Sequence, residues 1–257
     1  MALIDPLLTR VEPEGCTADC RHAGVIVEEA RAFATALGVE PRFRTVDWSE
    51  QFADASGEVR REASYTPALL ADGTCDLFVS NLARLPWRLT KLDIVPRFDS
   101  RMIALIRADD ADRIRRIDDL EGLTIGVAEQ SSFHSWVLEQ NSSIFAERPI
   151  RIVPANGQEP LRALLRGEVD FILTDADIAI SSLRASAPEL QVAFAIGPVQ
   201  QIGWGLAHGN PALEARIAAF FAEEKAQLSS PTNRTWVDAF GVSLAEFDAM
   251  VRALLVG

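Results

Sequence analysis

The sequence predicts an α/β protein, and three observations support this fold class. Apolar runs of strand length recur along the chain, at residues 75–81, 123–127 and 169–174. The last two are each followed by a segment with helical spacing, and such alternation predicts crossover connections and a mostly parallel sheet. The composition, 48% hydrophobic and 24% charged over 257 residues, is typical of a globular chain long enough for two lobes.

The N-terminal part predicts a helix followed by a strand and an insertion. Residues 25–37 place four apolar side chains on one helical face, and Gly38 follows as a stop signal. Residues 41–46 are short and strand-like. The polar stretch 49–64 breaks the pattern and indicates an insertion or a long loop.

The rest of the chain alternates more regularly. A short helix is expected over residues 67–71, and another helix begins near Ser132. Asn210 and Pro211 predict the cap and first residue of a helix, and Ser243 with Glu246 fits a capping box. Strands are expected over residues 75–81, 101–107, 123–127, 150–153, 169–174 and 202–206.

The net charge argues against nucleic acid as a partner, and the hydropathy argues against a membrane-spanning segment. A net charge of -12 repels phosphate backbones, so nucleic acid is not expected to bind. No run approaches the roughly 20 apolar residues that span a bilayer. Asp5 and Pro6 interrupt the start of the chain where a signal peptide has its apolar run. We therefore expect either a cytosolic protein or a mature or excised domain whose export signal or membrane anchor is absent here, and we favour the second.

The cysteines and the missing motifs argue against metal and cofactor chemistry. Cys16 and Cys20 are close enough to form a disulfide in an oxidising compartment, while Cys75 is expected to be a buried thiol. His22 is the one histidine near that pair, too few ligands for zinc. Phosphate-loop, dinucleotide, hydrolase and metalloprotease motifs are all absent from the sequence, so we expect no cofactor and no catalytic residues.

Three clusters of polar and glycine residues stand at or after predicted strand ends, where open parallel sheets bind ligands. They resemble the family 3 extracellular solute-binding proteins, the amino-acid-binding type of the periplasm. The matching residues are Asp76, Pro86, Arg88 and Asp93 in the first cluster, Gly126, Val127, Ser131 and Ser132 in the second, and Val169, Asp170 and Asp175 in the third.

The resemblance implies a role for each matched side chain. Arg88 is expected to bind the ligand carboxylate, because a guanidinium fork fits two carboxylate oxygens. Ser131 and Ser132 would add hydroxyl and N–H donors at a helix start, and Asp175 would hold the ligand ammonium. The remaining ligand-binding positions that the resemblance implies are Asn81 and Ala83 at a strand end and Trp48 as an aromatic wall.

The resemblance also implies the architecture and the partners. It predicts a two-lobed type II periplasmic-binding fold, each lobe a mostly parallel sheet flanked by helices. Lobe 1 would contain residues 1–100 and 204–257, and lobe 2 residues 101–203, with two hinge strands. The chain would close on a small-molecule ligand, an amino acid or a related carboxylate, for uptake through a membrane permease or for a receptor.

Local alternatives apply to each of these residues. Arg88 alone fits a surface side chain, Ser131, Ser132 and Asp175 fit helix caps, and Trp48 fits a core position. The chain also departs from the family, because Ala83 and Leu85 stand where hydroxyl residues are usual and Trp87 replaces glutamate. A modified amino acid or a small carboxylate is therefore also open as the ligand.

Two other functions fit the same features. One is a ligand-sensing domain of a membrane receptor or a regulatory lobe of a cell-wall enzyme. The other is a dehydratase built on this scaffold, which needs a cleft acid of raised pKa. Glu129 is the acid in the turn before the two serines and is the candidate for that role.

Overall fold

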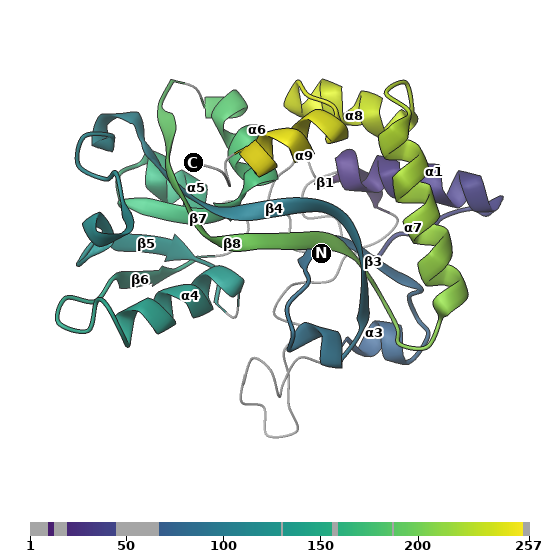
Figure 1. The fold of residues 1–257 in the computed structure, drawn as a ribbon, viewed down its shortest axis with the longest axis horizontal. Helices are drawn as coiled ribbons and strands as arrows, with labels where there is room; N and C mark the ends of the chain where they lie inside the picture. Colours follow the sequence, from purple (N-terminus) through teal and green to yellow (C-terminus); the bar gives the residue numbers. More distant parts are fainter. Residues whose placement is uncertain are drawn as a thin grey trace. The chain divides into compact units, whose positions relative to one another are not determined.

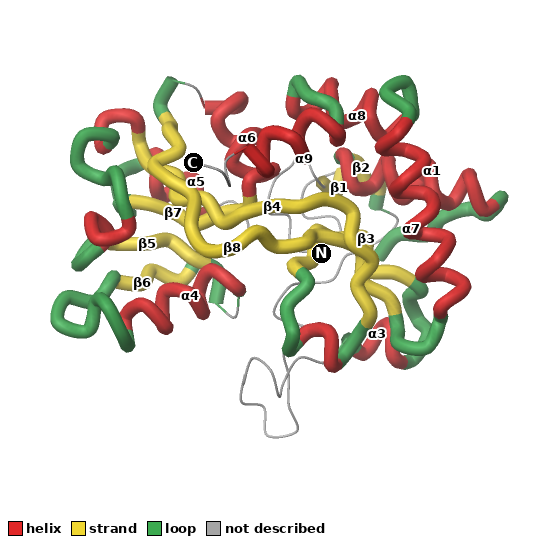
Figure 2. Tube along the Cα trace, viewed as in Figure 1, coloured by secondary structure: helices red, strands yellow, loops and turns green. Residues whose placement is uncertain are grey.

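The computed structural model describes residues 10–12, 20–44, 67–129, 131–155, 159–186 and 188–253. The chain divides into two compact units: unit 1 contains Met1–Asp99 and Gln200–Gly257, and unit 2 contains Ser100–Val199. Two long strands, β4 (Asp93–Arg107) and β8 (Leu190–Leu206), contribute residues to both units. Strands and helices alternate along the chain (Figure 1, Figure 2), so the predicted α/β class is confirmed.

In its described residues, unit 1 contains a two-stranded sheet, part of a larger sheet and several helices. Its strands are β1 (Arg10–Glu12), β2 (Arg21–Ala23), β3 (Leu77–Ala83) and parts of β4 and β8. Its helices are α1 (Val25–Leu37), α3 (Ala68–Ala71), α7 (Pro211–Ala226), α8 (Pro231–Phe240) and α9 (Leu244–Ala253). β8 lies between β3 and β4, and β3 runs antiparallel to β8.

Local signals fix several ends of these helices. Gly38 adopts φ 71° after α1, the left-handed conformation that glycine accepts without strain. The Asn210 side chain caps α7 by accepting the N–H of Leu213 at 3.1 Å. Ser243 and Glu246 form the predicted capping box at α9, with the Ser243 N–H donating to Glu246 Oε2 at 2.7 Å. These three predictions are confirmed.

The side chains of β3 alternate between two apolar clusters of unit 1. Leu77 and Val79 pack on a cluster that includes Phe33 of α1 and Trp204 of β8. Phe78 and Leu82 pack on a second cluster with Leu70 of α3. This is the period of two that a strand covered on both faces requires.

A glycine allows β8 to approach β4 closely. A Cβ added at Gly203 would lie 1.9 Å from the carbonyl oxygen of Val95, which no side chain can accommodate without moving backbone. Gly203 therefore determines how tightly the strands of unit 1 pack.

Unit 2 is a contiguous α/β unit. It contains β5 (Thr124–Val127), β6 (Arg151–Pro154) and β7 (Phe171–Asp175) with parts of β4 and β8, and helices α4 (Ser132–Asn141), α5 (Glu159–Leu165) and α6 (Ala176–Ser186). The 3-10 turns η3 (Ala108–Asp110) and η4 (Ile117–Leu120) join β4 to β5. β5 pairs in parallel with β6 and β7, whereas β4 and β7 are antiparallel, so the sheet is mixed. Its core includes Ile106, Ile125 and Phe171, all inaccessible to solvent.

Some local predictions differ from the structure. Residues 39–44 form no strand, because Phe43 packs against His22, with ring centroids 5.6 Å apart, instead of joining a sheet. β4 and β8 extend well beyond the predicted residues 101–107 and 202–206. Trp48, Cys16 and the polar stretch 49–64 lie outside the described residues.

The two cysteines within the described residues differ in state. Cys20 is disulfide-bonded. Cys75 is a free, half-buried thiol, and burial raises its pKa. None of the described helices is both long and apolar enough to cross a membrane.

Candidate functional site

Arg88 follows a tight turn at the end of β3. The N–H groups of Arg88 and Leu89 both donate to the carbonyl of Leu85 at 3.0 Å, which starts the 3-10 turn η2 (Arg88–Thr90). Arg88 is 3% exposed, and its Nη1 donates to the carbonyl oxygen of Ala83 at 2.6 Å. Its Cζ lies 4.8 Å from the centre of the Trp87 ring. The turn thus folds the guanidinium back against the strand that precedes it, unlike a surface arginine.

Asn81 and Ala83 belong to the same strand end. Ala83 is buried, and Asn81 is half-buried. The Asn81 side-chain oxygen accepts a hydrogen bond from Nη1 of Arg97 at 3.3 Å. The structure therefore places Ala83 and Arg88 in contact, and Asn81 lies two residues before Ala83 on the same strand.

The two serines of unit 2 have different environments. Ser131 is the N-cap of α4: its hydroxyl donates to the carbonyl of Ala128 at 2.6 Å and accepts the N–H of His134 at 3.1 Å. That hydroxyl proton is used within the turn, so Ser131 has the capping role. Ser132 begins the helix, and its hydroxyl makes no hydrogen bond to another described residue. The first-turn N–H groups of such a helix point toward its N-terminal end.

Asp175 is the last residue of β7, opposite Met102 of β4. It is partly buried and precedes α6, whose first N–H, from Ala176, donates to Ser100 Oγ at 3.1 Å. Because β5 and β7 are parallel neighbours, their carboxyl ends meet at one edge of the sheet. Asp175 and the start of α4, which follows β5, thus belong to that edge of unit 2.

Asp170, another residue of the matched pattern, has a structural role. Its Oδ2 accepts the N–H of Thr124 at 2.8 Å, and its Oδ1 accepts from Arg113 Nη2 at 2.9 Å. Burial alone would raise its pKa, but the Thr124 N–H and the Arg113 guanidinium together lower it. Asp170 therefore joins the start of β5 to the start of β7 as an ionised carboxylate.

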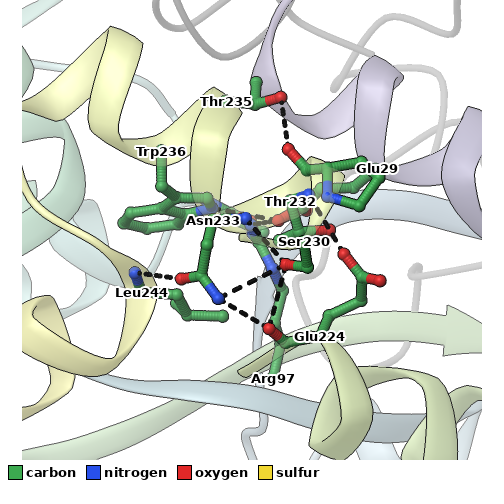
Figure 3. Close-up of polar contacts among 11 residues, drawn as sticks. Glu29, Arg97, Glu224, Ser230, Thr232, Asn233, Thr235, Trp236 and Leu244 are labelled. Carbon is green, nitrogen blue, oxygen red and sulfur yellow. Dashed lines mark hydrogen bonds and ion pairs between the residues drawn. The ribbon is translucent and has the colours of Figure 1, made fainter. Parts of the chain in front are cut away.

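The sequence did not identify a buried polar cluster in unit 1, which we call the Glu29–Arg97 cluster (Figure 3). Glu29 of α1 and Arg97 of β4 form an ion pair with 1% exposed side chains, and Trp236 Nε1 donates to Glu29 Oε1 at 2.9 Å. The available signals were weak: an arginine within the apolar run 94–98 and a glutamate among the buried residues of α1. Neither signal indicates which residue the side chain contacts, because Glu29, Arg97 and Trp236 are far apart in the sequence.

No set of three or more metal-binding side chains is gathered among the described residues. What the described geometry offers is two buried guanidinium groups in unit 1, Arg97 beside Glu29 and Arg88 at the end of β3, and, in unit 2, a helix start and a carboxylate at one sheet edge.

Comparison with known proteins identifies this arrangement of elements. A mutant of the arginine-binding protein ArgBP from T. maritima superposes with a TM-score of 0.71 at 18% identity, covering 93% of each chain. An ancestral arginine-binding protein bound to arginine gives 0.71 at 19% identity, covering 92% of this chain and 94% of that one. The L-cystine-binding protein TcyJ of Escherichia coli (strain K12) is 25% identical over 206 residues, which is 80% of this chain and 70% of TcyJ. The resemblance to the family 3 solute-binding proteins is confirmed.

The chain is also similar in sequence to a second kind of protein. Membrane-bound lytic murein transglycosylase F of Idiomarina loihiensis is 27% identical over 210 residues, 79% of this chain. The chain spans about two fifths of the length of the curated transglycosylases it matches, 42% and 40%. No family model matches the chain.

Proposed function

We propose that this chain binds one amino acid or a closely related carboxylate and does not transform it. The observation that carries the proposal is the buried Arg88 guanidinium at the end of β3, in a fold whose solved relatives include proteins bound to arginine, glutamine and lysine. The L-cystine-binding TcyJ supports the same class of ligand.

The chemistry of a buried guanidinium favours an anionic ligand. A guanidinium has five N–H donors in a rigid fork, and a carboxylate accepts two of them side by side. The fork of Arg88 therefore matches an amino-acid carboxylate in shape and charge, and the ligand's ammonium needs a separate acceptor.

The resemblance also implies ligand-binding roles for residues of unit 2, and the proposal keeps those roles. Asp175 supplies the negative charge for the ammonium. Ser132 contributes its hydroxyl and the first-turn N–H groups of α4, where the helix dipole favours negative charge. Ser131 contributes indirectly, because its capping bonds fix the helix start. One positive and one negative side chain suit a zwitterion.

Arg88→Ala tests the proposal. Calorimetry is run with L-arginine, L-lysine, L-glutamine and L-cystine, after a thermal-shift screen of the same compounds. The substitution is expected to cost about 2–5 kcal/mol of binding free energy, as for truncating one partner of a buried charge pair. Asp175→Asn is expected to weaken binding of the same ligand.

Arg84→Ala is the matched control. Arg84 is an exposed arginine of the same segment, and its Nη1 donates to Gln201 Oε1 at 3.3 Å. Its removal is expected to leave affinity within about twofold, as for other isolated surface contacts. Unchanged affinity in Arg88→Ala would remove Arg88 from the site.

A second candidate function is favoured by the transglycosylase relatives: a ligand-sensing lobe of a cell-wall enzyme. The same thermal-shift screen, extended to soluble peptidoglycan fragments, separates the two. Stabilisation by a free amino acid and not by the fragments favours a solute-binding protein, and the reverse favours the cell-wall lobe. A receptor-type sensing domain is distinguished from an uptake protein by co-purification with a permease.

The dehydratase alternative has less structural support, because Glu129 is exposed and a catalytic acid of raised pKa needs burial. Incubation with cyclic carboxylic acids followed by product analysis tests it. The proposed location is the periplasm or the cell exterior, where the disulfide of Cys20 would persist.

A further inference from the structure

Strands β4 and β8 are neighbours in the sheet and both run from one unit into the other (Figure 1). The boundary between the units falls after Asp99 in β4 and after Val199 in β8. A movement of one unit relative to the other must be absorbed by backbone torsions near these two points. The two strands differ in how their backbone is held there.

Side-chain contacts hold β4 on both sides of its boundary. On the unit 1 side, the carboxylate of Asp99 pairs with Arg252 of α9 at 3.5 Å. On the unit 2 side, Ser100 is fully buried, and its hydroxyl oxygen accepts the N–H of Ala176 at the start of α6 at 3.1 Å. Each contact lies within one unit, so β4 is fixed to both units right up to the boundary.

β8 has a backbone irregularity just before its boundary. Gly197 adopts φ 64°, a left-handed conformation that interrupts the extended backbone of a strand. A Cβ added at Gly197 would have no heavy atom within 4 Å, so this position needs glycine for its torsion angle and not for space. Pro198 follows and has no N–H to donate to a neighbouring strand. β8 is therefore the crossing strand whose torsions can change at low cost.

Arg101 connects this irregular point to the strand that is held. Its Nε donates to the carbonyl oxygen of Gly197 at 2.8 Å, although the two residues are 96 positions apart. A carbonyl oxygen moves when ψ of its own residue changes, so the hydrogen bond restrains the torsions of Gly197. Losing the bond costs free energy whenever Gly197 changes conformation.

We infer that Gly197 is the pivot of β8, which leaves its left-handed conformation when ligand binds, and that Arg101 is the latch that holds the pivot in that conformation. A ligand shifts a two-state equilibrium only by its differential affinity, so part of its binding energy is used to release the latch. Ligand affinity is then set in part by two residues to which no ligand contact is assigned. The inference rests on the proposed function.

Gly197→Ala is the first test, because the added methyl group has open space and acts on the torsion alone. A left-handed alanine costs more than a left-handed glycine, so the variant favours the state in which the pivot has turned. Calorimetry is run with L-arginine, L-lysine, L-glutamine and L-cystine. Affinity for whichever of them the wild-type chain binds is expected to rise about fivefold or more.

The matched control for the pivot is Gly167→Ala. Gly167 lies between α5 and β7, has φ 74°, and likewise leaves an added Cβ without a heavy atom within 4 Å. The substitution introduces the same strain away from the boundary. It is expected to lower the melting temperature about as much as Gly197→Ala and to leave affinity within about twofold.

Arg101→Ala is the second test. Removal of the latch is expected to raise affinity for the same ligand about twofold to tenfold, the net contribution of one hydrogen bond. Its matched control is Arg107→Ala, another arginine of β4, whose Nη1 donates to the carbonyl oxygens of Leu164 at 2.9 Å and Val169 at 2.6 Å. That control also removes a positive charge and backbone hydrogen bonds, but it should leave affinity within about twofold.

A third measurement needs no ligand. Small-angle X-ray scattering compares the wild-type chain with the double variant Gly197→Ala and Arg101→Ala, and with the double control Gly167→Ala and Arg107→Ala. The distance distribution is expected to change in the double variant and not in the double control, because only the former shifts the population of the pivot.

The outcomes separate the inference from the proposed function. If the wild-type chain binds none of the four amino acids, the proposed function fails, and unchanged scattering of the double variant would overturn the pivot as well. If it binds one and Gly197→Ala binds it no more tightly, the pivot is overturned and the proposed function stands. If Arg107→Ala raises affinity as much as Arg101→Ala does, Arg101 is not the latch.

Discussion

The two units use ion pairs in different ways. In unit 1, Glu29 and Arg97 form an ion pair that is shielded from water, and each side chain is 1% exposed. In unit 2, Arg113 is 46% exposed and bonds both Asp110 and Asp170 at 2.9 Å. Desolvation makes the first pair costly to form and more costly to break, while water screens the second. Charge pairs of similar chemistry thus fix geometry in one unit and contribute modestly to stability in the other.

The largest expected effect is that of Arg97→Met alone. It leaves the Glu29 carboxylate buried without its partner and should lower the free energy of unfolding by about 3–5 kcal/mol, measured by urea denaturation. Restoring neutrality with Glu29→Gln should recover most of that loss. If Arg97→Met alone were as stable as the wild type, the Glu29–Arg97 ion pair would not be shielded from water.

A smaller effect is expected for Asp170→Ala. This carboxylate also accepts a backbone N–H, from Thr124 at 2.8 Å, so its loss leaves a part-buried donor without its partner. The expected cost is about 1–3 kcal/mol of unfolding free energy, by the same measurement. Asp170→Asn, which keeps an acceptor, should cost less.

The effect of Asp170 on the pH dependence of stability should be smaller still. The pKa of Asp170 is lowered in the folded chain. Its contribution to stability is therefore present above the pKa of the unfolded chain, about 3.9, and is lost as the pH falls through the lower folded value. Melting temperatures measured from about pH 5 downward should therefore fall less steeply in Asp170→Asn than in the wild type. Parallel curves would contradict an ionised Asp170.

The smallest effect is expected for Arg113→Ala. An exposed arginine that pairs with two carboxylates is expected to contribute less than about 1 kcal/mol, and this should diminish in 1 M salt. Thermal melts at low and high salt measure it. A loss as large as that of Arg97→Met would remove the contrast between the units.

Features determined by neighbouring residues could be predicted from the sequence. The caps at Asn210 and Ser243 and the stop at Gly38 depend on side chains within a few positions. Features that need a distant partner could not. Phe43 belongs to a strand-like run, yet its partners His22 and Arg31 keep it out of a sheet. The long β8 was underestimated because Gln200 and Gln201 interrupt its apolar pattern.

The candidate site shows the same division. Arg88 was identified by its resemblance to a family pattern, but its burial depends on the turn that returns it to Ala83. Ser131 could be predicted as a cap or as a ligand, and only the bonds to Ala128 and His134 decide for the cap. The contact of Arg97 with Asn81 joins two strands and has no local signature.

The discontinuity of unit 1 has a consequence for synthesis on the ribosome. Met1–Asp99 is synthesised before Ser100–Val199, but the part of β8 that belongs to unit 1 and helices α7, α8 and α9 come from Gln200–Gly257. The nascent N-terminal segment must therefore wait, with Trp204 and Phe221 missing from its core, while Ser100–Val199 is already available to fold as a contiguous unit. We therefore expect Ser100–Val199 to complete its fold before unit 1, and the N-terminal segment of unit 1 to need protection from premature association until then.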